Sequence, residues 1–519
     1  MARILVTEEL APRGLDLMRA AGHEVDVRLN LSPDDLLAAV AGAAALIIRS
    51  ATTVTAEVLA AGTDLVVVGR AGIGLDNVDV ASATSRGVMV VNAPQSNVVS
   101  AAEQAMALLL AQARNIPQAH AALKAGKWER SRWEGVELHG KTLGVVGLGR
   151  VGALVAQRCL AFGMRLVAYD PFVAPERARH MGVTLMSLED VVREADFLTV
   201  HLPKTPETVG LINADLLKLA KPSLRIVNTA RGGIVVEDDL AEAVRTGVIQ
   251  GAALDVFAKE PTTESPLFAL DSVVVTPHLG ASTTEAQDKA GFTIAEQVLL
   301  ALAGDFVPFA VNVSAAEASE TVRPYLPLAE RLGRLLASVA ADESGPIDVV
   351  YEGALADYDT RILTLSALKG FLGAGTGEAV SYVNAPQVAQ AAGVEVREQR
   401  LATGSEYTNL ITLRRGAAGI AGTLVRGDAR LVMVDDHAID VPPSRHMLLV
   451  RNDDRPGMVG VVGTVLGRAG VNIADMALGR SPAGAAALMV IAHDAAVPPG
   501  VVDELAAQPG ITRVVAVVD

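Results

Sequence analysis

The fold of the N-terminal part of the chain is decided by one stretch, LGVVGLGRVG, at residues 143–152. Leu143–Val146 is apolar enough to form a buried strand, and the glycines after it have the spacing G-x-G-x-x-G that opens a nucleotide-binding helix. The second glycine lets the backbone approach a pyrophosphate, which the free N–H groups and the positive dipole end of the helix then bind. The stretch therefore predicts a dinucleotide-binding turn, with expected contacts at Gly147, Gly149, Arg150, Val151 and Gly152.

The next predicted strand ends at an acidic residue, Asp170, about 20 residues beyond the glycines. A carboxylate at this place accepts hydrogen bonds from the adenosine ribose hydroxyls and repels a 2′-phosphate. Pro171 adds no compensating positive charge. The sequence therefore favours NAD over NADP as the cofactor.

Outward from this stretch, short β-branched runs alternate with helical patterns over residues 1–312. Such alternation is typical of βαβ units and parallel sheets. Long Ala-rich helices are expected near 98–114 and 284–303, where the chain would cross between two domains. The predicted fold class is α/β: a doubly wound NAD-binding domain at 98–280, inserted into a doubly wound substrate-binding domain made of 1–97 and 281–312.

Two further domains are expected after these. Residues 313–441 mix helical and strand patterns and form an intervening α/β domain, in which the basic residues Arg426, Arg430 and Arg445 are scattered. Pro442 and Pro443 mark the next boundary. Residues 445–519 then show the order strand, helix, strand, strand, helix, strand. This βαββαβ order predicts a ferredoxin-like domain.

Charge and composition exclude several classes of protein. With 44 basic and 59 acidic residues the net charge is −15, which argues against a nucleic-acid partner and against docking on an anionic membrane. The longest apolar run, Leu36–Ile48, is too short to span a bilayer. The single cysteine, Cys159, rules out an intramolecular disulfide and a cysteine-rich metal site. We expect a cytoplasmic protein without a metal site.

Three chemically complementary side chains, Arg231, Glu260 and His278, follow later strands of the NAD-binding domain. The carboxyl ends of parallel strands meet at one edge of the sheet, where doubly wound sheets bind ligands. There Arg231 can bind a carboxylate through two hydrogen bonds, and His278 can take a hydroxyl proton as hydride leaves the adjacent carbon. Glu260 can orient the imidazole and stabilise its charged form. The set predicts oxidation of a 2-hydroxy acid.

The motifs around these residues resemble the D-isomer-specific 2-hydroxyacid dehydrogenases at residues 147–152, 228–233, 255–261 and 276–283. The resemblance covers about residues 1–312 and implies that Arg231, Glu260 and His278 are catalytic. It also implies that Asp255 binds the nicotinamide amide and that the loop at 201–208 lines the cofactor. Beyond the glycine turn, the cofactor residues implied in this way are Asp170, His201, Pro203, Thr205, Thr229, Ala230, Asp255 and Gly280.

Arginines also follow two predicted strands of the first domain, Arg49 and Arg70. With the stretch at 97–103, their surroundings resemble the family members that oxidise 3-phosphoglycerate at the start of L-serine synthesis. This substrate carries about three negative charges, because the second phosphate pKa lies near 6. We expect Arg49, Arg70 and Arg130 to bind the phosphate and Arg231 the carboxylate. The expected substrate site is Arg49, Ser50, Arg70, Gly72, Asn97, Arg130, Arg231 and His278.

The resemblance also implies assembly and regulation. The segment Trp128–Arg130 is similar to one that reaches a neighbour's active site in dimers of this family, so a homo-oligomer, dimer or tetramer, is expected. Residues 446–519 resemble an ACT domain, the module that senses amino acids. The implied effector is L-serine, bound at a strand, a Pro-Gly turn and a helix start. Its expected contacts are Asn452, Asp454, Pro456, Gly457 and Asn472, the last often from a paired subunit.

Two other functions remain open from the residues. The same set could serve a reductase for hydroxypyruvate, glyoxylate or another 2-oxo acid, with Arg49 and Arg70 only at the rim of the cleft. The ACT-like domain could act purely in dimerisation. A function of another class is a nucleotide-sensing scaffold on this fold, similar to the C-terminal-binding-protein corepressors, which also retain the Arg–Glu–His set.

Overall fold

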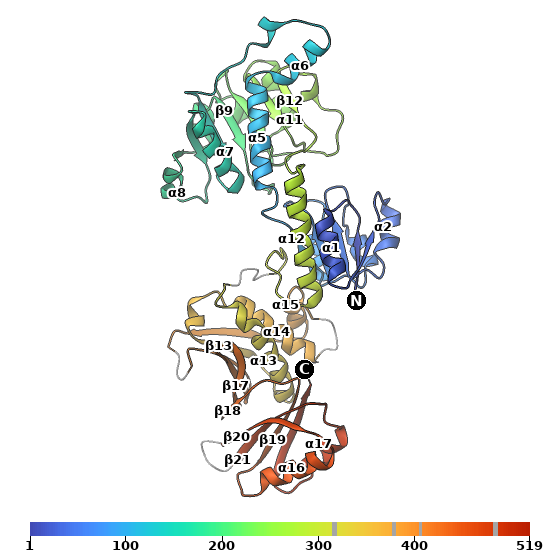
Figure 1. The fold of residues 1–519 in the computed structure, drawn as a ribbon. Helices are drawn as coiled ribbons and strands as arrows, with labels where there is room; N and C mark the ends of the chain where they lie inside the picture. The colour runs from blue at the N-terminus through green and yellow to red at the C-terminus, as the bar shows by residue number, and fades with distance from the viewer. Residues whose placement is uncertain (314–318, 376–379, 404–406, 481–485, 519) are drawn as a thin grey trace.

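The computed structural model describes residues 1–313, 319–375, 380–403, 407–480 and 486–518. Four sheets of these residues follow one another along an elongated molecule, with the NAD-binding domain and the C-terminal domain at opposite ends (Figure 1). No helix within the described ranges is long and apolar enough to cross a membrane. The predicted fold class, with parallel α/β domains followed by a mixed sheet and a ferredoxin-like domain, is confirmed.

The first sheet is wholly parallel, with strand order β2-β1-β3-β4-β5. Successive residues of its strands face opposite sides, so Ile4 packs toward α12 while Leu5 packs toward α2. Both faces are therefore covered by helices. The elements are β1 (Arg3–Val6), α1 (Pro12–Ala20), β2 (Glu24–Val27), α2 (Pro33–Val40), β3 (Ala45–Ile48), α3 (Ala56–Ala61), β4 (Val67–Arg70), α4 (Val80–Ser85), β5 (Met89–Val91) and α12 (Thr284–Ala303).

The second sheet is also parallel, in the order β12-β11-β10-β9-β6-β7-β8. Helices α5 and α7 cover one face and α9, α10 and α11 the other. The elements are α5 (Val98–Ala113), α6 (Ile116–Lys124), β6 (Thr142–Val146), α7 (Arg150–Ala161), β7 (Arg165–Tyr169), α8 (Pro175–His180), β8 (Val183–Leu185), α9 (Leu188–Glu194), β9 (Phe197–Val200), α10 (Ala214–Leu217), β10 (Arg225–Asn228), α11 (Glu237–Arg245), β11 (Gly251–Leu254) and β12 (Val273–Val275).

The intervening domain packs α13 (Leu326–Val339) and α14 (Arg361–Gly375) against a mixed sheet. Its strand order is β14-β13-β15-β16-β17-β18, in which only the β13–β14 pair is parallel. The sequence predicts strands near 346–352, 409–413 and 429–434, which correspond to β13, β15 and β17, but it does not predict β14, β16 and β18. The remaining elements are β13 (Ile347–Gly353), α15 (Ala385–Ala391), β14 (Val396–Leu401), β15 (Asn409–Arg415), β16 (Ala418–Val425), β17 (Asp428–Val434) and β18 (His437–Val441).

The C-terminal sheet has the antiparallel order β20-β21-β19-β22 of a ferredoxin-like domain. Helices α16 and α17 cover one face. The other face packs on the intervening domain, where Leu449 and Val490 share a core with Val339 and Val434. The elements are β19 (His446–Asp453), α16 (Met458–Arg468), β20 (Ile473–Arg480), β21 (Ala486–His493), α17 (Pro499–Ala506) and β22 (Ile511–Val518).

The intervening domain depends on the close crossing of α13 and α14. A Cβ on Gly370 would overlap the backbone oxygen of Glu330, whereas a Cβ on the exposed Gly373 would meet nothing. Gly370→Ala should therefore lower the free energy of unfolding by about 1–3 kcal/mol through overpacking. Gly373→Ala, on the same helix, should raise it by up to about 1 kcal/mol. Chemical denaturation of the full chain compares the two, and equal effects would contradict the crossing.

Candidate active site

The candidate site lies where the carboxyl ends of the two parallel sheets face each other. Asp76, after β4 of the first domain, pairs with Arg231, after β10 of the second, at 3.2 Å between Oδ2 and Nε. Arg150 at the start of α7 donates to the carbonyl of Pro94, again across the two domains. These contacts place the loops of both domains around one cleft.

The predicted acid–base pair is formed in this cleft. His278 Nδ1 lies 2.6 Å from Glu260 Oε2, and the two side chains are 44% and 32% exposed. Burial raises the pKa of Glu260, but hydrogen bonds from His278 and the Phe257 amide, with the charges of His278 and Arg231, outweigh burial and hold that pKa below its usual range. Glu260 is therefore ionised at neutral pH and can accept a hydrogen bond from Nδ1–H.

The turn that carries His278 is held by a buried carboxylate. His278 has a left-handed backbone with φ 54°, which is uncommon for a residue other than glycine. Fully buried Asp255 accepts the N–H groups of Leu279 and Gly280, each at 2.8 Å, and the hydroxyl of Thr276 at 2.5 Å. Its contact with the nicotinamide amide remains a prediction, since its oxygens already accept these three bonds.

Arg231 is held by close approach of neighbouring loops. Its Nη1 donates to the Ala230 carbonyl at 2.7 Å, while the Asn228 side chain bonds to the backbone of residues 230 and 231. A Cβ on Gly232 would overlap the backbone of Phe257, so glycine is required where this loop touches the loop that leads to Glu260. The sequence did not assign a role to Asp76, whose carboxylate completes the support of Arg231.

Two of the three arginines predicted to bind the phosphate, Arg49 and Arg70, lie close enough for their charges to interact. Burial lowers the pKa of Arg70; the positive charges of Arg231 and Arg49 lower it further, while Asp76 and Glu8 raise it. The guanidinium of Arg70 lies so close to Gly72 that a Cβ there would overlap it. Arg70 Nε and Asn97 Oδ1 are buried and have no hydrogen-bond partner among the described residues. Buried polar atoms without a partner are uncommon, and a bound ligand can supply the missing partner.

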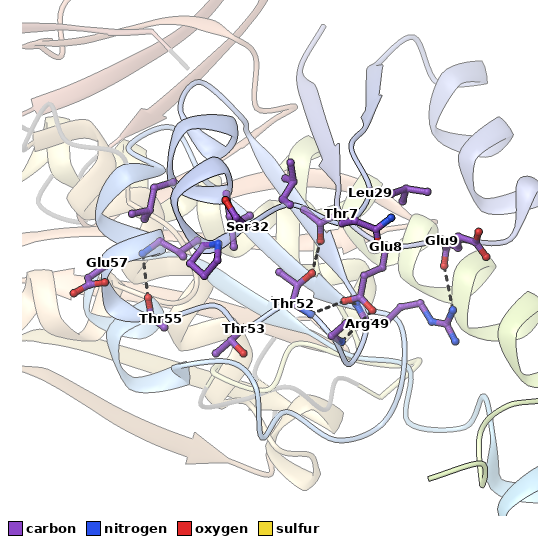
Figure 2. Close-up of a pocket in the computed structure, with 17 residues that line it drawn as sticks. Thr7, Glu8, Glu9, Leu29, Ser32, Arg49, Thr52, Thr53, Thr55 and Glu57 are labelled. Carbon is purple, nitrogen blue, oxygen red and sulfur yellow. Dashed lines mark hydrogen bonds between the residues drawn. The ribbon is translucent and has the colours of Figure 1, made fainter. Parts of the chain in front are cut away.

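Arg49 and the exposed Ser50 lie on the loop after β3, beside a hollow of about 560 Å³ at the ends of β1, β2 and β3 (Figure 2). Arg49 Nη1 donates to the Glu9 carbonyl at 3.3 Å. The backbone of this loop is bonded by the side chains of Glu8 and Asn77. The sequence predicts a role for neither Glu8 nor Asn77, because no local pattern marks them.

The glycine turn fits a dinucleotide. Gly147 has φ 96°, and a Cβ on Gly152 would overlap the carbonyl of Gly147. A Cβ on Gly149, in contrast, would point into open space where a pyrophosphate can lie. Asp170 Oδ2 accepts the N–H of Leu148 at 2.8 Å, so the carboxylate lies beside the turn as expected for binding a ribose.

The other expected cofactor residues surround this turn. His201 packs against Gly147 and Gly152, and its Nε2 lies 2.9 Å from the hydroxyl of Thr199. Pro203 and Thr205 form a turn closed by the Thr208 hydroxyl. Thr229 Oγ1, next to Ala230, is buried and without a partner within the described part of the chain. Their binding roles remain predictions.

Two expected groups are not brought to their sites within one chain. Arg130 lies exposed in the 3-10 helix Arg130–Trp133, next to α6, which is at the far end of the NAD-binding domain from the first sheet (Figure 1). Asn472 precedes β20, whose first residue pairs with the end of β21, whereas Asp453 pairs with its beginning. Asn472 therefore lies at the opposite end of the sheet from Asp454 and Gly457.

The expected effector residues are partly engaged already. Asn452 is buried with Oδ1 unpaired among the residues described, and Asp454 forms an ion pair with Arg480 at 3.3 Å. Gly457, after Pro456, begins α16 with φ 94°. No group of three or more His, Cys, Asp or Glu side chains that could hold a metal ion occurs in the ranges that the structure describes.

Family models match three parts of the chain. The model for the D-isomer specific 2-hydroxyacid dehydrogenase NAD binding domain matches residues 106–280. A D-3-phosphoglycerate dehydrogenase intervening domain matches 321–435, and an ACT domain matches 446–510.

Characterised relatives match nearly the whole chain. It is 50% identical over 507 residues to the D-3-phosphoglycerate dehydrogenase of Mycobacterium leprae, covering 95% of each chain. It is 42% identical to that of Synechocystis over 519 residues, covering 98% of this chain and 94% of the relative. The chain belongs to the D-3-phosphoglycerate dehydrogenase family. It is an NAD-dependent 2-hydroxyacid dehydrogenase.

Solved structures agree for the first two domains. A protein of Thermus thermophilus matches 60% of this chain over 99% of its own, with TM-score 0.56 and 37% identity. An NAD-dependent formate dehydrogenase of Staphylococcus aureus in complex with NAD matches 58% of this chain over 95% of its own, with TM-score 0.53 and 30% identity. The predicted family and cofactor are confirmed.

The pKa of His201 makes stability depend on pH. Burial lowers this pKa from the ordinary 6.5 to about 4. Because the unfolded chain takes up the proton at a higher pH than the folded chain, the free energy of unfolding decreases as the pH falls from 6.5 toward 4. The decrease is up to about 1.4 kcal/mol per pH unit. We expect the His201→Asn variant to lack this decrease in the free energy of unfolding, as measured by calorimetric melts between pH 7 and 4.5.

The exposed His180 supplies the control for this measurement. His180→Asn should follow the wild type at every pH. A His201→Asn variant that loses stability as steeply as the wild type would contradict the assignment.

Proposed function

We propose that this enzyme oxidises D-3-phosphoglycerate to 3-phosphohydroxypyruvate with NAD, the first step of L-serine synthesis. The observation that carries the proposal is the convergence of Arg49, Arg70 and Arg231 beside the His278–Glu260 pair. Relatives that bear the name of this activity share up to half of its residues over nearly the full chain.

Arg231 would bind the substrate carboxylate. Asp76 and the Ala230 carbonyl each engage one of its nitrogens, Nε and Nη1, which leaves N–H groups of Nη1 and Nη2 for a ligand. A carboxylate held at a fixed guanidinium orients the neighbouring C2 and its hydroxyl toward His278.

His278 would act as the general base. Ionised Glu260 accepts a hydrogen bond from Nδ1–H, so the lone pair of the imidazole is on Nε2, which has no partner among the described residues. Nε2 takes the hydroxyl proton, and Glu260 stabilises the imidazolium that results. When bound, NAD accepts the hydride from C2.

Arg49 and Arg70 would bind the phosphate. The charges of Arg231 and Arg49 repel that of Arg70, whereas Asp76 and Glu8 attract it. A substrate with about three negative charges relieves this repulsion, whereas an unphosphorylated acid engages Arg231 alone. This difference separates the proposal from the 2-oxo acid reductase that the residues also permit.

Removing either arginine tests the phosphate assignment. We expect Arg49→Ala and Arg70→Ala each to raise KM for 3-phosphoglycerate about 10- to 100-fold, as for loss of a charged hydrogen bond. KM for D-glycerate, which differs only by the phosphate, should change less than about threefold. NADH formation at alkaline pH, with the oxo product trapped, measures both.

Arg86, exposed at the opposite edge of the same sheet, supplies the control. Arg86→Ala should leave both constants unchanged. If the wild type instead prefers hydroxypyruvate, glyoxylate or D-lactate, the enzyme is the 2-oxo acid reductase and the proposal is wrong. Tight NADH binding with no turnover of any acid would instead favour a nucleotide-sensing scaffold.

We further propose that L-serine inhibits the enzyme at the ACT domain. Support comes from the helix start at Gly457, the unpaired Oδ1 of buried Asn452 and the partly buried carboxylate of Asp454. The amino acid's carboxylate would bind the N–H groups after Pro456, and its ammonium would replace Arg480 on Asp454. Asn472 would come from a second chain.

Neutralising the proposed ammonium contact tests this assignment. Asp454→Asn should raise the L-serine concentration for half inhibition by about tenfold or more, because a charged hydrogen bond is lost. Asp453→Asn, the adjacent exposed acid, is the matched control and should behave as the wild type. If the wild type keeps full activity at every serine concentration, the proposal is wrong and the ACT domain acts purely in dimerisation.

Assembly and location are also part of the proposal. Exposed apolar side chains on and just after α6 support a homo-oligomer, a dimer or tetramer, in which Arg130 reaches a neighbour's site. These side chains are Ile116, Leu123 and Trp128. The single cysteine is buried and free, which supports a reducing cytoplasm. We also propose the domain limits predicted from the sequence, 1–97 with 281–312, 98–280, 313–441 and 445–519.

A further inference from the structure

The loop that carries Arg49 and Ser50 is bonded to a carboxylate from another loop. Glu8, just after β1, accepts the N–H groups of Arg49 at 2.7 Å, Ala51 at 3.1 Å and Thr52 at 2.9 Å. Figure 2 shows this carboxylate directed at the loop. Oε1 accepts two of the bonds and Oε2 the third, so both oxygens are used.

Such a row of N–H groups around one point is an anion-binding concavity of the kind that elsewhere holds a phosphate. Here the chain's own carboxylate fills it. The three N–H groups belong to the backbone of the loop. Their bonds to the Glu8 carboxylate therefore leave the side chains of the loop available for a ligand. The Thr7 and Thr52 hydroxyls, 2.9 Å apart, add a second link between the two segments.

The opposite side of the loop is held as well. Asn77 Nδ2 donates to the carbonyl of Arg49 at 2.8 Å and to that of Thr52 at 2.6 Å. Glu8 therefore binds the N–H groups and Asn77 the carbonyl groups of one short loop. With its backbone bonded on both sides, the loop is ordered before substrate binds.

We propose that Glu8 is a positioning residue for the phosphate group: it holds residues 49–52 so that Arg49 and Ser50 meet the phosphate in place. This inference rests on the proposed function, since it assigns the phosphate to Arg49. Glu8 has no bond to Arg231, Glu260 or His278 in the described chain, so it acts on binding of the phosphorylated end and not on proton or hydride transfer.

Glu8→Gln is the decisive variant, because it keeps the size of the side chain and replaces one accepting oxygen by an NH2 group facing an N–H group. KM for 3-phosphoglycerate should rise about 10- to 100-fold, as for loss of a hydrogen bond to a charged group. kcat and KM for D-glycerate should stay within about twofold, because the catalytic residues are untouched.

The neighbouring acid is a matched control. Glu9 contacts Arg49 only through its backbone carbonyl, and its side chain is exposed. Glu9→Gln removes the same charge one residue away and should leave every constant within about twofold. If Glu8 acted only as a repelling charge, Glu8→Gln would lower KM for 3-phosphoglycerate, which would overturn the proposal.

A double mutant shows whether Glu8 acts through Arg49. In an Arg49→Ala background, Glu8→Gln should raise KM for 3-phosphoglycerate much less than it does in the wild type, because the charged group that Glu8 positions is gone. Additive effects of the two changes would overturn the proposal. Unchanged KM in Glu8→Gln, with Arg49→Ala strongly impaired, would overturn it while leaving the proposed function intact. No effect of Arg49→Ala itself would instead refute the phosphate assignment.

Glu8→Asp keeps the test decisive should Glu8→Gln not fold. It retains a carboxylate that is one methylene too short for all three N–H groups. If Glu8→Asp binds NADH as tightly as the wild type does, a rise of at least about threefold in KM for 3-phosphoglycerate supports the positioning role. A KM equal to that of the wild type overturns it.

Discussion

The catalytic geometry depends on the buried carboxylate of Asp255. By accepting the N–H groups of Leu279 and Gly280, it holds His278 in a left-handed conformation that an ordinary residue seldom adopts. That conformation sets where the imidazole meets Glu260. Glu8 bonds in the same way to the Arg49 loop, in the other domain. A carboxylate that collects successive backbone N–H groups thus orders one loop on each side of the cleft, and each loop presents a side chain to the substrate.

Arg70 lies near two further arginines, Arg49 and Arg231, in a chain whose net charge is −15. Their positive charges repel its own, and burial adds to the cost of that charge. The ion pair between Asp76 and Arg231 offsets part of this repulsion and also joins the two domains. Under the proposed function, a substrate with several negative charges would relieve this repulsion at the same place where the two domains are joined.

The sequence predicted the groups that do chemistry because their types and positions are informative in themselves. A glycine turn after a strand, and Arg231, Glu260 and His278 at strand ends, are local patterns. The supporting residues are not. Glu8 and Asn77 bond to a loop that is distant in sequence, and nothing in their own neighbourhoods distinguishes them from surface residues. The intervening sheet was predicted in part for a related reason. The exposed, charged β14 lacks an apolar strand pattern, and in β16 the alanines and glycines at 418, 419, 421 and 422 interrupt the β-branched residues that mark a strand.

Packing divides the molecule differently from the catalytic cleft. One continuous core includes Ile4 of the first sheet, Val298 of α12, Leu332 of the intervening domain and Leu449 of the ACT domain. The cores of the NAD-binding domain are separate from it. A change at the ACT sheet therefore has an unbroken packed route to the domain that carries Arg49 and Arg70. Such a change reaches the NAD-binding domain through α5 and α12, which link the two domains, and through the contacts between their loops. Under the proposed functions, an effector bound at the ACT domain would act through this packing on the position of Arg49 and Arg70 relative to His278.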